Sequence, residues 1–208
     1  MFKSTYLFFA TLSLTLILSA CTTKQAPIVM DSDSAIPGTQ VSKNGKELAL
    51  TGTGIKVGQK LPETSLVDAA TMKPVNFMAY RGSVLFLSIV PSIDTKVCEA
   101  QTHYLGEQGD KLPASVKRIT VSRDTPFAQA RFAKEAKLED VQYLSDYKEG
   151  AFGRSIGLLM DGPRLLARSV IIVDKQGIVQ YIQVVPDITH FPDMEEAFAK
   201  ANALDKLP

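Results

Sequence analysis

The segment 83–90 (SVLFLSIV) is the part of this sequence that most constrains how the chain can fold. It is apolar without interruption and has the length of one strand, a pattern typical of a strand whose sheet is covered on both faces. After it, Val97, Ala100 and Tyr104 have the spacing of residues on one face of a helix. The sequence therefore predicts a buried strand that leads directly into a helix.

Strand-like and helix-like segments continue to alternate along the rest of the chain. Segments 116–122 and 141–146 have strand character, and the segment between them opens with Asp124 and Pro126, which suit the start of a helix. Residues 169–185 indicate two strands joined by a tight turn. The last segment has one apolar helical face, formed by Met194, Ala197, Phe198, Ala201 and Leu204.

This order of elements predicts an α/β protein with a thioredoxin-like sheet. Asn44-Gly45, between two extended stretches, predicts a β-hairpin at the start of the domain. Residues 21–40 are rich in Thr, Ser, Asp and Pro and show no sustained period, so we expect a flexible tether there and one domain over residues 41–208. A fold of this kind does not by itself give a function.

Residues 1–20 have the organisation of an export signal. Lys3 is followed by an apolar stretch too short for a comfortable membrane span, and the stretch ends in LSAC, of which Cys21 is the last residue. This ending resembles the lipobox of bacterial lipoproteins, which implies cleavage before Cys21 and lipidation of its thiol. A plain signal peptide or a buried N-terminal helix is the alternative. The resemblance implies a lipid-anchored protein of the bacterial cell envelope, and Thr22 suits the periplasmic side of the outer membrane.

Charge and cysteine usage argue against several other classes of protein. The chain has 23 basic and 22 acidic residues and a formal net charge of +1, so no strong field favours nucleic acid as a partner. Two cysteines cannot form a framework of disulfides, and no CxxC or HExxH spacing is present. We therefore expect neither a disulfide oxidoreductase nor a metal site, and no cofactor.

Cys98 is one of the two cysteines and lies at the predicted start of the helix after the buried strand. A free thiol is only a few per cent ionised at neutral pH. Unpaired backbone N–H groups and the positive end of the helix dipole would favour the reactive thiolate at such a position. A cysteine placed in this way could attack a peroxide, an acyl group or a disulfide. The alternative is a small buried core residue.

The residues around Cys98 narrow this choice. The spacing P-x-x-x-T-x-x-C, formed by Pro91, Thr95 and Cys98, resembles the active-site loop of peroxiredoxins. The longer segment PSIDTKVCEAQT is similar to the thiol peroxidase branch, the atypical two-cysteine peroxiredoxins, and so are TPFAQARFA, LSDYKEGAFGRSIGLLMDGP and LLARSVIIVDKQGIVQY, in the same order. The resemblance runs from Val41 to the C-terminus and implies a thioredoxin-like fold of the peroxiredoxin type.

The resemblance implies a role for each of four residues. Cys98 would attack the terminal oxygen of a hydroperoxide, and Thr95 would hydrogen-bond the reacting oxygens. Arg168 would stabilise the thiolate and the leaving oxygen, and Pro91 would shield the pocket from water. On spacing alone, Thr95 could be only a helix N-cap, Pro91 a strand end and Arg168 a surface ion-pair partner. His103, five residues after Cys98 on the same helix, would point to another side, so we do not expect a Cys–His hydrolase.

One position departs from the family pattern. Thiol peroxidases carry a second, resolving cysteine in the segment RFC, whereas this chain has RFAKE, with Ala133 at that position. With Cys21 acylated, the oxidised Cys98 would have to be met by an external thiol, from a small molecule or a thioredoxin-like protein, or by Cys98 of a second subunit.

The expected activity is a thiol-dependent peroxidase for hydrogen peroxide and alkyl or lipid hydroperoxides, with a one-cysteine-type cycle. The family resemblance also implies a homodimer. The alternative is an envelope-anchored binding or redox-sensing lipoprotein on the same scaffold, with little turnover.

Overall fold

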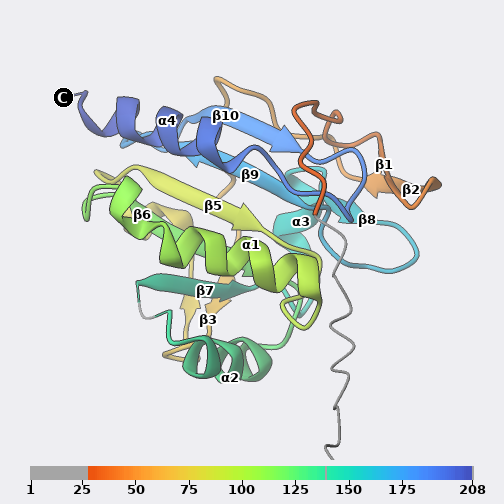
Figure 1. Cartoon of the computed structure of the whole chain (residues 1–208), viewed down its shortest axis with the longest axis horizontal. Helices are drawn as coiled ribbons and strands as arrows, with labels where there is room; N and C mark the ends of the chain where they lie inside the picture. The colour runs from red at the N-terminus through yellow and green to blue at the C-terminus, as the bar shows by residue number, and fades with distance from the viewer. Residues whose placement is uncertain (1–27, 139, 208) are drawn as a thin grey trace, which may run out of the picture.

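The computed structural model describes residues 28–138 and 140–207 (Figure 1). A seven-stranded sheet has the order β10-β9-β5-β6-β7-β3-β4, and a three-stranded sheet has the order β1-β2-β8. The strands are β1 (Gln40–Lys43), β2 (Lys46–Thr51), β3 (Leu66–Asp68), β4 (Pro74–Val75), β5 (Leu85–Ile89), β6 (Lys117–Ser122), β7 (Val141–Ser145), β8 (Leu159–Met160), β9 (Ser169–Val173) and β10 (Val179–Val184). The α-helices are α1 (Lys96–Glu107), α2 (Pro126–Ala136), α3 (Ala151–Ser155) and α4 (Met194–Asp205), with short 3₁₀ helices η1 (Phe77–Tyr80) and η2 (Gly109–Lys111).

The strand β5 is an interior strand of the larger sheet, and both of its faces are buried. It pairs in parallel with β6 and antiparallel with β9. Phe86 belongs to the core formed with the helices α1, α2 and α4, whereas Leu87 and Ile89 belong to the core on the other face, together with Phe152 of α3. Figure 1 shows α1 and α4 on the same side of the sheet. This double cover confirms the predicted α/β fold and explains the uninterrupted apolar run.

The start of α2 differs in detail from the predicted one. Thr125 is the N-cap residue, and its side chain accepts a hydrogen bond from the Ala128 N–H at 3.3 Å. The Asp124 carboxylate instead accepts hydrogen bonds from Ser92 Oγ at 2.7 Å and from the Ile93 N–H at 2.8 Å. Asp124 therefore ties the β6–α2 connection to the loop that precedes α1.

The strands β1 and β2 form the predicted N-terminal hairpin. Asn44 and Gly45 occupy its two-residue turn, with φ angles of 51° and 79°. Such a turn matches the twist of the strands only when both central residues have positive φ, which Asn and Gly tolerate best. The Asn44 N–H also donates to the Asp187 carboxylate at 2.9 Å, so this turn lies beside the loop after β10.

Residues preceding the hairpin lie along β10 and the loop after it. The Ala35 N–H donates to the Val184 carbonyl oxygen at 2.8 Å, and the Asp31 N–H donates to the Phe191 carbonyl oxygen at 2.9 Å. The composition predicted a flexible tether through residue 40, but these main-chain hydrogen bonds hold residues 31–35 against the domain. Polar composition alone does not exclude such pairing, because its donors and acceptors are backbone groups.

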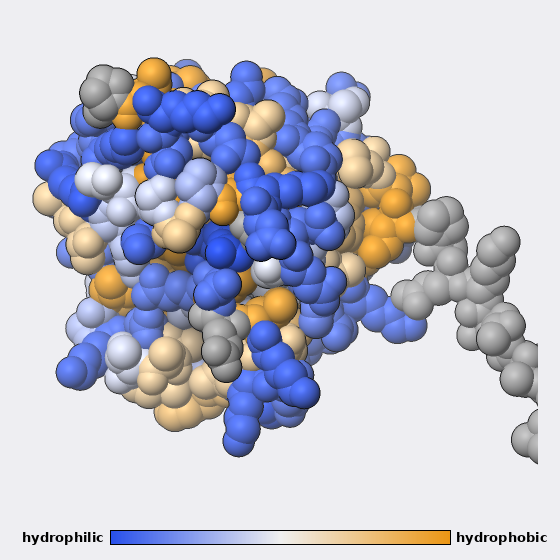
Figure 2. Space-filling view, turned by 60° about the vertical axis from the view of Figure 1, so that its left-hand side comes forward, coloured by the Kyte–Doolittle hydropathy of each residue, from blue (hydrophilic) through white to orange (hydrophobic). Residues whose placement is uncertain are grey.

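The predicted anchor lies outside the described residues, since these begin after both the signal peptide (1–20) and Cys21. In the part of the chain that the structure describes, no helix is both long enough and apolar enough to cross a membrane. Figure 2 shows a face that is mainly hydrophilic, with separate apolar patches. Large apolar side chains are exposed at the start of the described chain, at Ile28, Val29 and Met30.

Candidate active site

Cys98 lies in the first turn of α1, where the chain enters the helix from the loop after β5. The Cys98 side chain is fully buried. It lines a pocket of about 210 Å³. The lining of this pocket brings together all four residues predicted from the sequence: Pro91, Thr95, Cys98 and Arg168. Residues far apart in the sequence thus meet at one sulfur atom.

Thr95 is the N-cap residue of α1, but its hydroxyl makes no capping hydrogen bond. The Thr95 Oγ1 lies 3.0 Å from Cys98 Sγ and 3.2 Å from the Ser92 carbonyl oxygen. A hydroxyl has one proton, so Thr95 donates to one of these two atoms at a time. The hydroxyl faces the sulfur, in a geometry that a residue serving only as an N-cap would not adopt.

Arg168 lies just before β9 and is only 2% exposed. Its Nη2 lies 3.2 Å from Cys98 Sγ, its Nη1 donates to Gln101 Oε1 at 2.7 Å, and its Nε donates to the Ile188 carbonyl oxygen at 2.8 Å. Burial lowers the pKa of Arg168, while the neighbouring Cys98 opposes that change. All three guanidinium nitrogens are engaged, so this side chain is not the surface ion-pair partner that its spacing alone allowed.

Gln101 is a site residue that the sequence analysis did not single out. It is fully buried on α1, accepts the hydrogen bond from Arg168, and donates through Nε2 to Ser88 Oγ of β5 at 2.9 Å. Residues three apart on a helix share a face, so Gln101 lies on the Cys98 side of α1. A polar residue three positions after Cys98 was the signal that could have identified it.

The loop between β5 and α1 is held in place by Asp124, which follows the neighbouring strand β6. Pro91 is buried two residues after the end of β5, and the two following residues, Ser92 and Ile93, hydrogen-bond to the Asp124 carboxylate. That carboxylate also accepts a hydrogen bond from Ser122 Oγ at 2.6 Å. Because Asp124 is far from the loop in sequence, no local pattern could have assigned it this role.

Other titratable residues near α1 in the sequence point elsewhere. His103 Nδ1 lies 2.8 Å from Glu107 Oε1, on the exposed side of the helix, and no imidazole of the described residues hydrogen-bonds Cys98 Sγ. The His103 side chain thus contacts Glu107 on α1, one turn further along the helix and away from Cys98. Within residues 28–138 and 140–207, no group of three His, Cys, Asp or Glu side chains lies close enough to hold a metal ion.

A cationic donor and a hydroxyl donor therefore converge on one sulfur in a small pocket. Positive charge beside a cysteine stabilises its thiolate, which is the nucleophilic form. Donors fixed around the sulfur are also placed to bind an oxygen atom that gains negative charge when its bond to a neighbouring atom breaks. The arrangement suits attack by a thiolate on a substrate whose leaving atom is an oxygen.

Comparison with known proteins gives the family. A model of the redoxin family matches residues 56–198. The thiol peroxidase of Staphylococcus saprophyticus is 40% identical over 158 residues, which are 76% of this chain and 94% of that protein. The chain belongs to the thiol peroxidase family. The thiol peroxidase of Bacillus subtilis is 38% identical over 168 residues, which are 80% of this chain and 99% of that protein.

Solved structures agree with the thiol peroxidase fold. A peroxiredoxin-like protein from Aquifex aeolicus superposes with a TM-score of 0.74 at 31% identity, covering 82% of this chain and 99% of its own. The thiol peroxidase from Chromobacterium violaceum gives a TM-score of 0.67 at 18% identity, over 79% of this chain and 97% of its own, a likeness of fold alone. The chain is accordingly an enzyme of the peroxiredoxin type, which reduces a peroxide at the expense of a thiol.

Proposed function

We propose that Cys98 is the cysteine that attacks the peroxide and that Thr95, Arg168 and Pro91 complete its site. One observation carries this proposal: Arg168 Nη2 and Thr95 Oγ1 converge on the same sulfur, at 3.2 Å and 3.0 Å. Cys98 is also the one free cysteine found among the described residues. The family requires a reactive thiol, and these contacts support this one.

The reaction begins with attack of the Cys98 thiolate on the terminal oxygen of a hydroperoxide. A sulfur–oxygen bond forms, the oxygen–oxygen bond breaks, and its electron pair leaves on the second oxygen, which takes a proton to become an alcohol or water. The sulfur is oxidised by two electrons to a sulfenic acid. Arg168 and Thr95 stabilise the negative charge on the oxygens as it develops, and Pro91 limits the access of water.

The size and the apolar lining of the pocket favour a substrate range that includes molecules larger than hydrogen peroxide. The side chains of Val97, Leu165 and Ile188 contribute apolar lining beside Cys98 in a space of about 210 Å³. An alkyl group beside the hydroperoxide would replace water in contact with this lining, which favours binding. We therefore include hydrogen peroxide together with alkyl and lipid hydroperoxides in the proposed substrate range.

Regeneration of Cys98 is proposed to need a thiol from outside the chain. Ala133 occupies the position of the family's resolving cysteine on α2, and Cys21 is proposed to be acylated. An external thiol would attack the sulfenic sulfur, releasing water and forming a mixed disulfide, and a second thiol would then free Cys98. A small thiol or a thioredoxin-like protein would supply these groups.

Stopped-flow mixing of the reduced protein with hydrogen peroxide, and separately with an alkyl hydroperoxide, tests the proposal. We expect a second-order rate constant far above that of free cysteine, and loss of the reaction in Cys98→Ser. A wild-type rate equal to that of free cysteine would instead favour the alternative, a binding or redox-sensing lipoprotein with little turnover. Turnover with added thioredoxin or a small thiol then shows which reductant closes the cycle.

The proposed location is the bacterial cell envelope, with the protein held by lipid on Cys21 at the periplasmic side of the outer membrane. Mass spectrometry of the processed N-terminus should show cleavage before Cys21 and added acyl mass, and Cys21→Ser should move the protein from the membrane fraction to the soluble fraction. A free Cys21 thiol in the processed protein would contradict the anchor. A homodimer, implied by the family, is testable by sedimentation of the Cys21→Ser variant.

A further inference from the structure

An N-terminal segment that precedes the family match packs close to the active-site pocket. The redoxin match begins at residue 56, whereas residues 28–35, called here the N-terminal clamp, lie against the loop 186–191. The Phe191 N–H donates to the Val29 carbonyl oxygen at 2.7 Å, and the Asp31 N–H donates to the Phe191 carbonyl oxygen at 2.9 Å. The clamp and the end of the loop thus form a short strand-like pairing.

The loop 186–191 lies between the clamp and the catalytic pocket. Ile188 and Thr189 of this loop line the pocket beside Cys98. The Ile188 carbonyl oxygen accepts the hydrogen bond from Arg168 Nε at 2.8 Å. The position of the loop therefore sets the position of the Ile188 carbonyl oxygen, one of the three hydrogen-bond partners of the Arg168 guanidinium.

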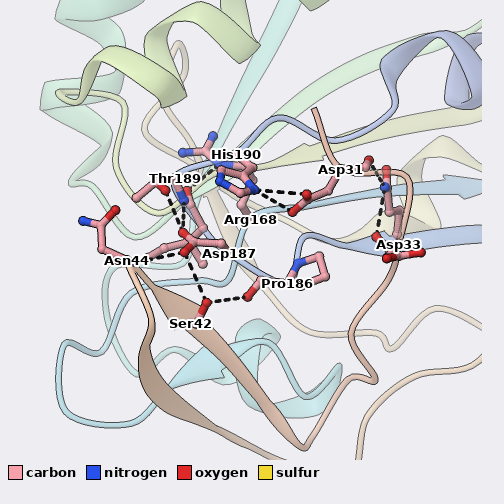
Figure 3. Close-up of polar contacts among 11 residues, drawn as sticks. Asp31, Asp33, Ser42, Asn44, Arg168, Pro186, Asp187, Thr189 and His190 are labelled. Atoms are coloured by element: carbon pink, nitrogen blue, oxygen red, sulfur yellow. Dashed lines mark hydrogen bonds and ion pairs between the residues drawn. The ribbon is translucent and has the colours of Figure 1, made fainter. Parts of the chain in front are cut away.

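Asp187 fixes one side of this loop to the hairpin turn. Its carboxylate accepts hydrogen bonds from the Asn44 N–H at 2.9 Å, from Ser42 Oγ at 3.3 Å and from Thr189 Oγ1 at 2.7 Å. Figure 3 shows these side chains gathered around Asp187. None of these three partners belongs to the clamp, so the contacts of Asp187 hold the loop independently of it.

Asp31 fixes the other side of the loop to the clamp. His190 Nδ1 lies 3.0 Å from each carboxylate oxygen of Asp31, as Figure 3 shows. An ionised carboxylate only accepts hydrogen bonds, so Nδ1 carries the proton in this contact. The two side chains are 32% and 22% exposed, which leaves the pair partly shielded from water. Gln183 Nε2 donates to the Asp31 carbonyl oxygen at 2.7 Å and holds the clamp in place.

We infer that Asp31 is a positioning residue for Arg168. It holds His190, and through it the loop whose Ile188 carbonyl oxygen orients the guanidinium beside Cys98. Removing the carboxylate charge weakens the contact with His190, while the two main-chain hydrogen bonds to Phe191 remain. The clamp side of the loop is then held less firmly, and Asp187 still holds the other side. The guanidinium then has a less precisely placed partner, and small displacements of catalytic groups slow a reaction. The expected slower reaction with peroxide rests on the proposed function. The expected change in how firmly the loop is held does not.

The test compares Asp31→Asn with Asp33→Asn. Asp33 is a matched control, since it lies on the same clamp and its carboxylate makes no hydrogen bond or ion pair with any other described residue. We expect Asp31→Asn to speed hydrogen exchange at the backbone amides of residues 188–191 and to lower the second-order rate constant for hydrogen peroxide about three- to fivefold, as fits the weakening of one partly exposed polar contact. Asp33→Asn should change neither quantity.

A second variant removes the other partner. His190→Gln should match Asp31→Asn in both measurements, and the double variant should show no further loss, because both changes break one interaction. Unchanged exchange and rate in Asp31→Asn would overturn the inference, and so would faster exchange with an unchanged rate. A wild-type rate equal to that of free cysteine, with exchange that still responds to Asp31→Asn, would refute the proposed function and leave the link between clamp and loop intact.

Discussion

At the scale of single residues, the site depends on how one guanidinium divides its donors. Arg168 gives one nitrogen to the Cys98 sulfur, one to the Gln101 amide and one to the Ile188 carbonyl oxygen. The last two contacts hold the plane of the guanidinium, and the first then meets the sulfur in a fixed direction. A lysine ammonium is a point charge on a flexible stem and cannot make the same three contacts.

We expect Arg168→Lys to lower the second-order rate constant for peroxide by about a hundredfold, the size typical of losing one preorganised charge-stabilising donor. The positive charge is kept, so the loss reports its placement. Stopped-flow kinetics measures the constant, and circular dichroism checks that the fold is retained. A Lys variant as fast as the wild type would mean that charge alone is sufficient.

Thr95 gives a second prediction at this scale. Thr95→Val should slow the reaction by roughly ten- to a hundredfold, which is what one hydrogen bond to a charged group is worth. Thr95→Ser, which keeps the hydroxyl, should remain close to the wild type. Because the hydroxyl makes no capping hydrogen bond, the melting temperature of the Val variant should change little. A Val variant as fast as the wild type, or a Ser variant as slow as the Val variant, would contradict a role carried by the hydroxyl alone.

At the scale of elements, loops from different parts of the chain hold the proposed catalytic residues. Asp124, at the end of β6, anchors the loop that carries Pro91 into α1. Asp187, after β10, anchors the loop that provides the carbonyl partner of Arg168. In each case one carboxylate accepts several hydrogen bonds from a neighbouring segment, which fixes the loop without a strand or a helix.

Asp187 offers a test by pH. Burial raises its pKa, but hydrogen bonds from Thr189, from Ser42 and from the Asn44 N–H outweigh burial and hold the pKa below its ordinary value of 3.8. A carboxylate with a lowered pKa in the folded state stabilises the fold above its unfolded pKa, and this contribution is lost as the pH falls through the folded pKa.

We therefore expect Asp187→Asn to be less stable than the wild type at neutral pH, and the difference to shrink below about pH 4. Urea unfolding of both proteins across this range gives the free energies of unfolding. A difference of constant size down to about pH 3 would show that the charge of Asp187 is not responsible.

The sequence predicted the long elements well because their signals are local. The run 83–90 contains β5, and the apolar spacing after Val97 corresponds to α1. The short elements α3 and β8 were not predicted, since five and two residues are too few to show a period. The strand β8 depends on its pairing with β2 of the hairpin. The helix α3 depends on the Asp146 carboxylate, which accepts hydrogen bonds from the Phe152 and Gly153 N–H groups.

The residues of the candidate site also fall into two groups, those that a local sequence pattern predicts and those that it does not. Pro91, Thr95 and Cys98 lie in one short segment, formed by the loop after β5 and the first turn of α1, and their spacing alone resembled a known motif. Arg168 is 70 residues from Cys98 in sequence, so only the family resemblance could propose that the two meet. Asp31 could not be found by either route, because its partner His190 is 159 residues away and its segment precedes the family match.

At the scale of the whole molecule, the proposed one-cysteine-type cycle depends on which thiol meets the oxidised sulfur. Ala133 lines a hollow of about 350 Å³ between α2 and β7, with Ala130 and Leu138 nearby. No thiol of the described chain other than Cys98 is present to form an internal disulfide. In the absence of reductant, the sulfenic acid is then exposed to a second molecule of peroxide.

We expect graded hydrogen peroxide, without added thiol, to convert Cys98 to the sulfinic acid, and mass spectrometry to show a gain of two oxygens. Ala133→Cys restores the family pattern and should lower the yield of sulfinic acid by diverting the sulfenic acid to a disulfide. The matched control is Ala130→Cys, on the same helix. An internal disulfide in the unmodified chain would mean that Cys21 is free and can reach Cys98.

The complete burial of Cys98 has a consequence for recycling. A small thiol can diffuse into the pocket, so its reaction with the oxidised sulfur should speed up in proportion to its concentration. A folded protein partner is too bulky to enter, so it would reach the sulfur only if the first turn of α1 unwound. Recycling by such a partner should therefore level off at the unwinding rate of that turn, however much of the partner is supplied.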